Sequence, residues 1–148
     1  SYDLLIDYKT FICREYQQPL SCYRQRNSAI VPLSVTTIVG YHAHIYYDPQ
    51  NPEDLASAQH LRKLMEEKFA ASFGRWRDVP VGPHPSAMFQ VAFSNSVFPE
   101  LLPWLMLNCE GRSILVHPET GHDLDNHSLQ AVWLGEKLAL KLDNLKNS

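Results

Sequence analysis

Five histidines are the residues of this chain whose types and spacing could support metal chemistry. His42 and His44 stand two apart in "GYHAHIYYDP", His84 lies in "GPHP", His117 in "ILVHPETG" and His127 in "DLDNH". Because side chains of a β-strand alternate between its two faces, the first two project from the same face if their segment is a strand. Neutral imidazole is a good ligand for iron, zinc and copper, so a convergence of these side chains would suit a transition metal.

Each histidine also has an ordinary structural interpretation when it is taken singly. A lone strand histidine is more often a hydrogen-bonded core residue than a ligand. His84 could end a turn, and His127 could cap the segment that begins at Ser128. His60 is expected on a solvated helix surface, and His122 falls in a loop without an evident place in the group. Only convergence in the folded chain favours the metal site.

An acidic side chain would complete a site of two histidines and one carboxylate, as in many non-haem iron proteins. The candidates are Asp48, Glu119, Asp123 and Asp125. Asp48 is better explained as the end of its strand and a cap. Asp123 and Asp125 are better explained as loop residues or as partners that orient a histidine.

The elements that must position these residues follow from hydrophobic periodicity and turn residues. Residues 36–48 are rich in β-branched and aromatic side chains, which predicts a first strand. Residues 51–74 predict an amphipathic helix capped by Asn51 and closed by Gly74. The further elements expected are a short edge strand at 75–82, a third strand at 86–93, a helix at 97–107 and a fourth strand at 112–118.

This order of strand, helix, strand, strand, helix, strand predicts an α+β fold, the ferredoxin-like βαββαβ sandwich with an antiparallel sheet and helices on one face. In that topology the first and fourth strands are antiparallel neighbours, so His117 should lie near His42. If Ala43 and Ile45 face the helices, the imidazoles of the first strand stand on the open face of the sheet.

The domain organisation is expected to be one ferredoxin-like domain, residues 36–148, preceded by an N-terminal arm or extension, residues 1–35, which lacks periodicity. Residues 123–145 predict an amphipathic C-terminal tail segment. Its apolar residues, which must pack against the domain, are Leu129, Val132, Trp133, Leu138 and Leu142. Trp104 and Trp133 are expected in the core.

Composition limits the partners and the compartment. The formal net charge is -3, and the basic residues are scattered rather than arranged in a stripe, which argues against a nucleic-acid partner. No segment has the pattern of a membrane span or of a secretory leader. Cys13, Cys22 and Cys109 lack paired spacing, so we expect reduced structural thiols and a cytoplasmic protein.

Five stretches together resemble the small DOPA 4,5-dioxygenase family of fungi and bacteria: "GYHAHIYYDP", "GPHPSAMFQVAF", "WLMLN", "ILVHPETG" and "DNHSLQAVWLGE". The resemblance covers about residues 38 to 140, and all five histidines match its motifs. It implies a ferredoxin-like fold, a homodimer, and ring opening of L-DOPA or a related catechol with non-haem Fe(II). Cys109 and Glu110 depart from the family, whose members tend to carry a basic or imidazole side chain there.

The principal hypothesis is therefore an extradiol dioxygenase that acts on a catechol and O2. Sheet adjacency assigns His42, His44 and His117 as metal ligands, which leaves His84 and His127 for acid–base catalysis or substrate positioning. His84 and His42 could exchange these roles, and zinc or another divalent metal could occupy the site. The alternatives are a non-catalytic ferredoxin-like dimer that binds a metal or an aromatic small molecule, and a zinc-dependent hydrolase, which lacks a general-base carboxylate at a defined offset.

Overall fold

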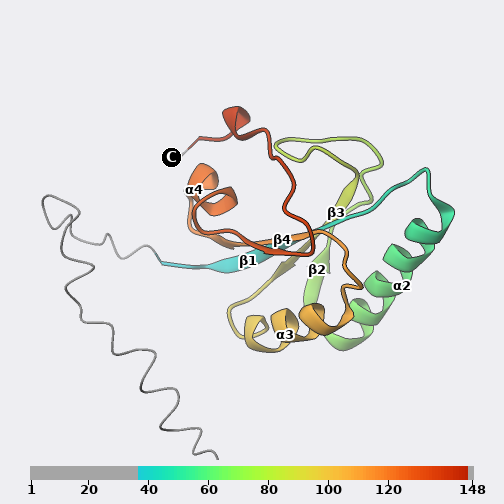
Figure 1. Cartoon of the computed structure of the whole chain (residues 1–148). Coiled ribbons are helices and arrows are strands. Elements are labelled where there is room, and N and C mark those ends of the chain that lie inside the picture. The colour runs from blue at the N-terminus through green and yellow to red at the C-terminus, as the bar shows by residue number, and fades with distance from the viewer. Residues whose placement is uncertain (1–36, 147–148) are drawn as a thin grey trace, which may run out of the picture. The chain divides into compact units, whose positions relative to one another are not determined.

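A single antiparallel sheet organises the part of the chain that the structure, a computed structural model, describes, which is residues 37–146. The predicted arm, residues 1–35, lies outside the described residues. The strand order is β2-β3-β1-β4-β5 (Figure 1). The strands are β1 (Gly40–Tyr46), β2 (Ala71–Phe73), β3 (Met88–Phe93), β4 (Ile114–Glu119) and β5 (Val132–Leu134).

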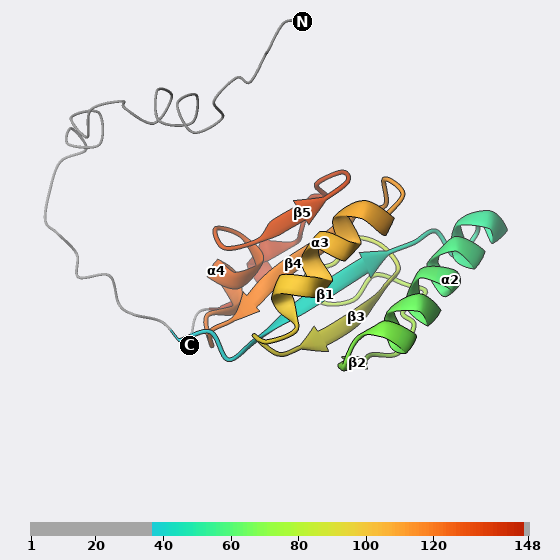
Figure 2. The ribbon, with the colours of Figure 1, turned by 90° about the horizontal axis from the view of Figure 1, so that it is seen from below.

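Two helices cover one face of this sheet, as Figure 2 shows. Helix α2 (Pro52–Lys68) begins where the Asn51 side chain accepts hydrogen bonds from the amides of Glu53 and Asp54. Helix α3 (Phe98–Asn108) connects β3 to β4. The apolar core lies between helices and sheet and includes Ala43, Ile45, Ala58, Met65, Phe89, Val91, Leu101, Leu105, Ile114 and Val116.

The α+β class and the antiparallel βαββαβ sandwich predicted from the sequence are confirmed by this arrangement. Strand β1 pairs with β3 on one side and with β4 on the other, both antiparallel. The first and fourth strands of the predicted pattern are therefore direct neighbours, as expected.

Two predicted boundaries on the β2 side of the sheet were wrong. The helix expected over 51–74 ends at Lys68, and residues Ala71–Phe73 form strand β2 instead. Phe69 and Phe73 are four residues apart, a spacing that fits a helix and equally fits two steps of strand alternation. The edge strand predicted at 75–82 is a loop with two isolated β-bridges, Arg77 to Met88 and Val81 to His84.

The C-terminal tail, predicted as one amphipathic segment, consists of several short elements. It forms helix α4 (Asp123–His127), strand β5 and a short 3-10 turn, η2 (Leu142–Asn144). Gly135 ends β5 with a φ of +67°, and a Cβ there would lie 2.5 Å from the Arg112 carbonyl oxygen. Only glycine fits this turn, and it breaks the segment.

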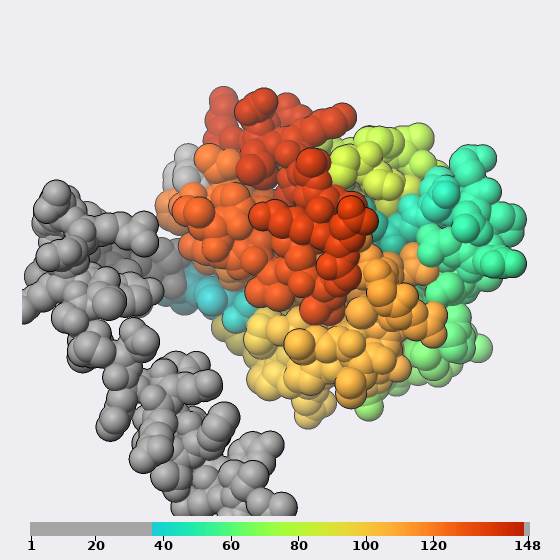
Figure 3. All heavy atoms as spheres, viewed as in Figure 1, coloured from blue at the N-terminus to red at the C-terminus, as the bar shows by residue number. Residues whose placement is uncertain are grey.

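The residues after β4 cover part of the sheet face opposite the helices. They form a continuous group of atoms from orange to red in Figure 3. A second apolar cluster lies beneath them, in which Tyr46, Met88 and Leu115 are buried against Trp133, Leu138, Ala131 and Leu140. The expectation that every apolar tail residue packs was wrong for Leu129, which is 86% exposed, and for Val132, which is 46% exposed. None of the helices among residues 37–146 is long and apolar enough to cross a membrane.

Candidate metal centre

The register of β1 determines where its two histidines point. Ala43 and Ile45 are fully buried in the helix-side core, so His42 and His44 project from the opposite face. His42 is the direct cross-strand partner of His117 on β4. The sequence-based expectation that these two residues meet across the central strands is confirmed.

The other two imidazoles reach the same place from outside the sheet. His84 comes from the loop before β3, and its ring centroid lies 4.1 Å from that of His44. The ring centroid of His127, at the end of α4, lies 4.0 Å from that of His117. His44, His84 and His117 are at most 4% exposed. All five predicted histidines therefore converge.

The remaining two histidines lie outside this imidazole cluster, as the sequence suggested. His60 is on the exposed surface of α2, and His122 occupies the position before α4. They are useful as controls because they share the residue type but not the location.

Hydrogen bonds assign the protons of most of these rings. His117 Nδ1 donates to the Pro118 carbonyl oxygen at 2.9 Å, and His127 Nδ1 donates to the Asp123 carbonyl oxygen at 2.9 Å. His42 Nδ1 lies 3.1 Å from Glu119 Oε1. In a neutral imidazole the other ring nitrogen, Nε2, then carries a lone pair. These three rings are thus set to act as ligands through Nε2.

His44 is left with an unsatisfied nitrogen at the centre of the cluster. Its Nε2 lies 3.1 Å from His117 Nε2. Because the His117 proton is on Nδ1, His44 Nε2 must be the donor in this pair. His44 Nδ1 is then a buried lone pair without a partner among the described residues. Such an atom is costly unless something binds it.

The cluster fits a divalent metal ion. Ring nitrogens within 4.8 Å of one another form two overlapping groups, His42 with His44 and His117, and His44 with His84 and His127. Metal–nitrogen bonds of 2.0–2.1 Å would place two ligand nitrogens on one ion about 3.0–3.4 Å apart. The Nε2 atoms of His44 and His117, at 3.1 Å, satisfy this requirement.

Burial keeps these imidazoles neutral, which is the form that binds metals. Desolvation, together with the nearby His127, lowers the pKa of His84 to about 4 and that of His117 to about 3. The pKa of His44 is held well below its usual value by desolvation and by the neighbouring imidazoles. Desolvation also lowers the pKa of His42.

Of the acidic candidates, Glu119 lies against two of the ligand rings, in both cases at Nδ1. Its Oε1 lies 3.1 Å from His42 Nδ1 and 3.4 Å from His117 Nδ1. A carboxylate in this position orients imidazoles and increases their basicity. Asp48 is exposed and accepts a hydrogen bond from the Gln50 amide, as a capping residue would. Asp123 holds His127 through its backbone carbonyl rather than its carboxylate.

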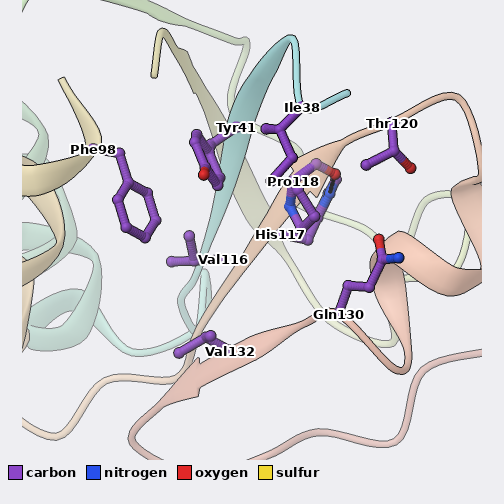
Figure 4. A pocket seen from close by; sticks show the side chains of 9 residues that line it. All are labelled: Ile38, Tyr41, Phe98, Val116, His117, Pro118, Thr120, Gln130 and Val132. Carbon is purple, nitrogen blue, oxygen red and sulfur yellow. Dashed lines mark hydrogen bonds between the residues drawn. The ribbon is translucent and has the colours of Figure 1, made fainter. Parts of the chain in front are cut away.

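Three cavities reach the imidazole cluster. A largely apolar cavity of about 380 Å³ lies beside His117 and is lined by Tyr41, Phe98 and Val132 (Figure 4). A wider one of about 630 Å³ opens at His42 and Glu119. A third, of about 430 Å³, includes His44 and His84 in its lining. Small molecules therefore have room on more than one side of the cluster.

Residues 41–144 match the model of the Dopa 4,5-dioxygenase family, a range that contains all five histidines. The chain belongs to this family. It is 31% identical over 111 residues to a DOPA 4,5-dioxygenase of Amanita muscaria, and 36% identical over 115 residues to an uncharacterised 21.2 kDa protein of Botryotinia fuckeliana. These matches cover 71% and 72% of this chain, but only 49% and 63% of the two relatives.

The fold of the family is represented by a solved structure as well. The crystal structure of a candidate dioxygenase from Nostoc punctiforme superposes with a TM-score of 0.68 at 45% identity. The superposition covers 72% of this chain and 90% of that one. The departure from the family at Cys109 and Glu110 lies after α3, where Glu110 contacts Ser57 of α2. It is therefore on the helix side of the sheet, opposite the imidazoles.

Sequence reasoning missed one residue of the site, Tyr46. Its hydroxyl lies 2.7 Å from His84 Nδ1, and the side chain is 4% exposed. The signal was present, because Tyr46 is two residues after His44 and so shares its face of β1. Tyr46 holds the loop histidine against the sheet.

Proposed function

We propose that this protein is an extradiol ring-cleaving dioxygenase that opens the ring of L-DOPA or a related catechol with a non-haem divalent metal, Fe(II), and O2. The observation that carries the proposal is the convergence of five imidazoles on one sheet face, where the Nε2 atoms of His44 and His117 lie 3.1 Å apart. Family membership and the match to the Amanita enzyme support it.

In this proposal His42, His44 and His117 hold the metal. When bound, the metal would supply a Lewis-acidic centre with open positions for the two catechol oxygens and for O2. Three protein ligands leave that room. Glu119 orients the His42 ring through Nδ1, and the Pro118 carbonyl oxygen orients the His117 ring through Nδ1.

His84 and His127 are the proposed acid–base residues. The lowered pKa of His84, about 4, means that it is neutral near pH 7, the form in which its ring can accept a hydrogen bond from a catechol hydroxyl. Tyr46 fixes its ring through Nδ1. The alternative is that His84 binds the metal with His44 and His127 while His42 acts as the base, because these three also form a group of adequate spacing.

The test is anaerobic reconstitution of the full chain with ferrous iron, followed by L-DOPA and then air. We expect one O2 consumed per catechol and a new absorption band in the visible range. The exposed His60→Ala variant should behave like the unmodified protein. Tight iron binding without oxygen uptake from any catechol would contradict the proposal and favour a non-catalytic metal-binding protein.

We also propose that the protein is a homodimer, as the family resemblance implies. Large apolar side chains remain exposed on the helix side of the described domain, among them Met106 at 61% and Leu107 at 86% on α3. Sedimentation equilibrium of the full chain should give a mass twice that of one chain. The Leu107→Glu variant should give a mass closer to that of a single chain. A single-chain mass at micromolar concentration would reject the dimer.

A further inference from the structure

One side of the imidazole cluster carries positive charge that the chemistry proposed above does not use. The cavity of about 430 Å³ beside His44 and His84 is also lined by Arg75, Arg77 and Gln90. It lies over the β3 side of the sheet, and the C-terminal segment borders it where the Lys141 amide donates to the Pro83 carbonyl oxygen at 2.9 Å.

The backbone places Arg77 on the same face as the imidazoles. Arg77 exchanges two hydrogen bonds with Met88, at 2.9 and 3.0 Å, and Met88 is the cross-strand partner of Tyr46. Tyr46 shares the face of His44. Trp76, next to Arg77, instead enters the helix-side core, where its ring lies 4.7 Å from that of Phe89.

The two guanidinium groups are also free of partners within the described residues. Neither Arg75 nor Arg77 forms a salt bridge or a side-chain hydrogen bond there, and both are exposed. The other two arginines of that range are engaged: Arg62 lies 2.8 Å from Glu66, and Arg112 lies 2.8 Å from Asp54. Free guanidinium groups that border a cavity are suited to bind a carboxylate, which matches their planar fork.

The spacing suits a ligand with a ring at one end and a carboxylate at the other. Neighbouring strands are about 4.8 Å apart, so the Arg77 backbone is roughly 10 Å from β1 across the sheet. Between them, Gly74 donates a backbone hydrogen bond to the Gln90 carbonyl oxygen at 2.8 Å, and both residues line the cavity. A ring held at the imidazoles with a side chain of two or three carbons would bring a carboxylate within reach of an arginine.

We propose that Arg75 and Arg77 bind the carboxylate of the substrate, so that the protein selects catechols with an anionic side chain over neutral ones. This inference rests on the proposed function, because it names the part of the substrate that the metal does not hold. It assigns the two arginines as specificity residues and leaves the reacting ring to the histidines.

The experiment compares two catechols of similar size, 3-(3,4-dihydroxyphenyl)propionate and 4-ethylcatechol, by oxygen uptake of the iron-loaded full chain. For Arg77→Gln and for the Arg75→Gln/Arg77→Gln double variant, we expect kcat/KM to fall about ten- to hundredfold with the propionate, mainly through KM. With 4-ethylcatechol it should change less than about twofold. Lys63→Gln, which removes an exposed charge from α2, is the matched control.

A second measurement separates this inference from the proposed function. Calorimetric titration with 3-phenylpropionate, which has no ring hydroxyl, reports carboxylate binding without ring cleavage. If no catechol is turned over but the affinity for phenylpropionate falls at least tenfold in the double variant, the dioxygenase proposal fails and the carboxylate site stands. Equal losses of kcat/KM for both catechols would overturn the carboxylate site. If no catechol is turned over, the carboxylate site is also overturned when phenylpropionate does not bind, or when it binds the double variant as tightly as the unmodified protein.

Discussion

His44 is the residue on which the whole imidazole cluster depends. It contacts the rings of His42, His84, His117 and His127 and belongs to both groups of candidate ligands. Its buried Nδ1 has no partner in the described part of the chain, so the cluster is incomplete as a purely structural hydrogen-bond network. A cation bound at Nε2 of His44 and of His117 would offset part of the cost of burying these imidazoles together.

Replacement of His44 should therefore abolish metal binding under either assignment of the ligands. We expect the iron or zinc content of His44→Ala, measured by atomic emission after dialysis, to fall below about a tenth of that of the unmodified protein. His60→Ala is the matched control, since it removes an exposed imidazole from α2. Near-ultraviolet circular dichroism checks that the variant is folded. A folded His44→Ala protein with full metal content would remove His44 from the site.

Helix α4 shows how a very short element can position a reactive side chain. Its five residues are too few to be stable alone, so tertiary contacts must hold it in place. Asn126 is completely buried, and its Oδ1 accepts a hydrogen bond of 2.5 Å from Thr120. His127 follows immediately and donates to the Asp123 carbonyl oxygen. The Thr120–Asn126 pair thus anchors the turn that presents His127.

Loss of that anchor should release α4 without unfolding the sheet. Thr120→Val keeps the shape of the side chain, but the buried Asn126 Oδ1 loses the hydrogen bond from Thr120. We expect a cost of about 1–3 kcal/mol in the free energy of unfolding. We expect faster hydrogen exchange of the amides of α4, while those of β1 stay protected. Ser57→Ala, which removes an exposed contact of 3.4 Å, is the control. Unchanged exchange in α4 would show that other contacts hold the helix.

Sequence reasoning predicted the central elements better than the edges. β1 and β4 are recognisable because their β-branched and apolar residues are continuous, and the topology then brings His117 to His42. The segment from Phe69 to Phe73 is ambiguous, because a four-residue spacing suits both a helix and a strand. Tertiary pairing with β3, which local periodicity does not report, resolves it as β2. The position of Arg77 on the imidazole face likewise depends on its pairing with Met88, which local periodicity does not report.

At the scale of the whole domain, the sheet separates two layers of opposite character. One face packs against α2 and α3 through apolar side chains, and the other carries neutral imidazoles under partial cover. The face that carries the imidazoles should lower the stability of the folded domain at acidic pH. The folded domain resists protonation of His84 and His117, whose pKa values are lowered to about 4 and about 3, whereas the unfolded chain takes up protons near pH 6.5.

The metal-free protein should therefore lose stability as the pH falls below about 6.5. The unfolded state binds more protons than the folded state in the range from about 6.5 down to about 4, so the free energy of unfolding decreases with decreasing pH. Each such histidine contributes up to about 1.4 kcal/mol per pH unit. Urea denaturation between pH 7.5 and 5 measures this slope, which His60→Ala should leave unchanged. A flat profile would mean that these imidazoles are solvated in the folded protein.

The sequence distance across the central strand pair has a consequence for how the protein is made. His44 and His117 are 73 positions apart, and His127 comes later still. At about 5–20 residues per second, the ribosome needs about 4–15 s to go from one to the other. During that interval β1 is present without β4, and of the five imidazoles only His42, His44 and, once position 84 has been made, His84 are available. The proposed ligand set of His42, His44 and His117 is complete only once β4 has been made, so we expect metal binding at this site to follow the pairing of β1 with β4.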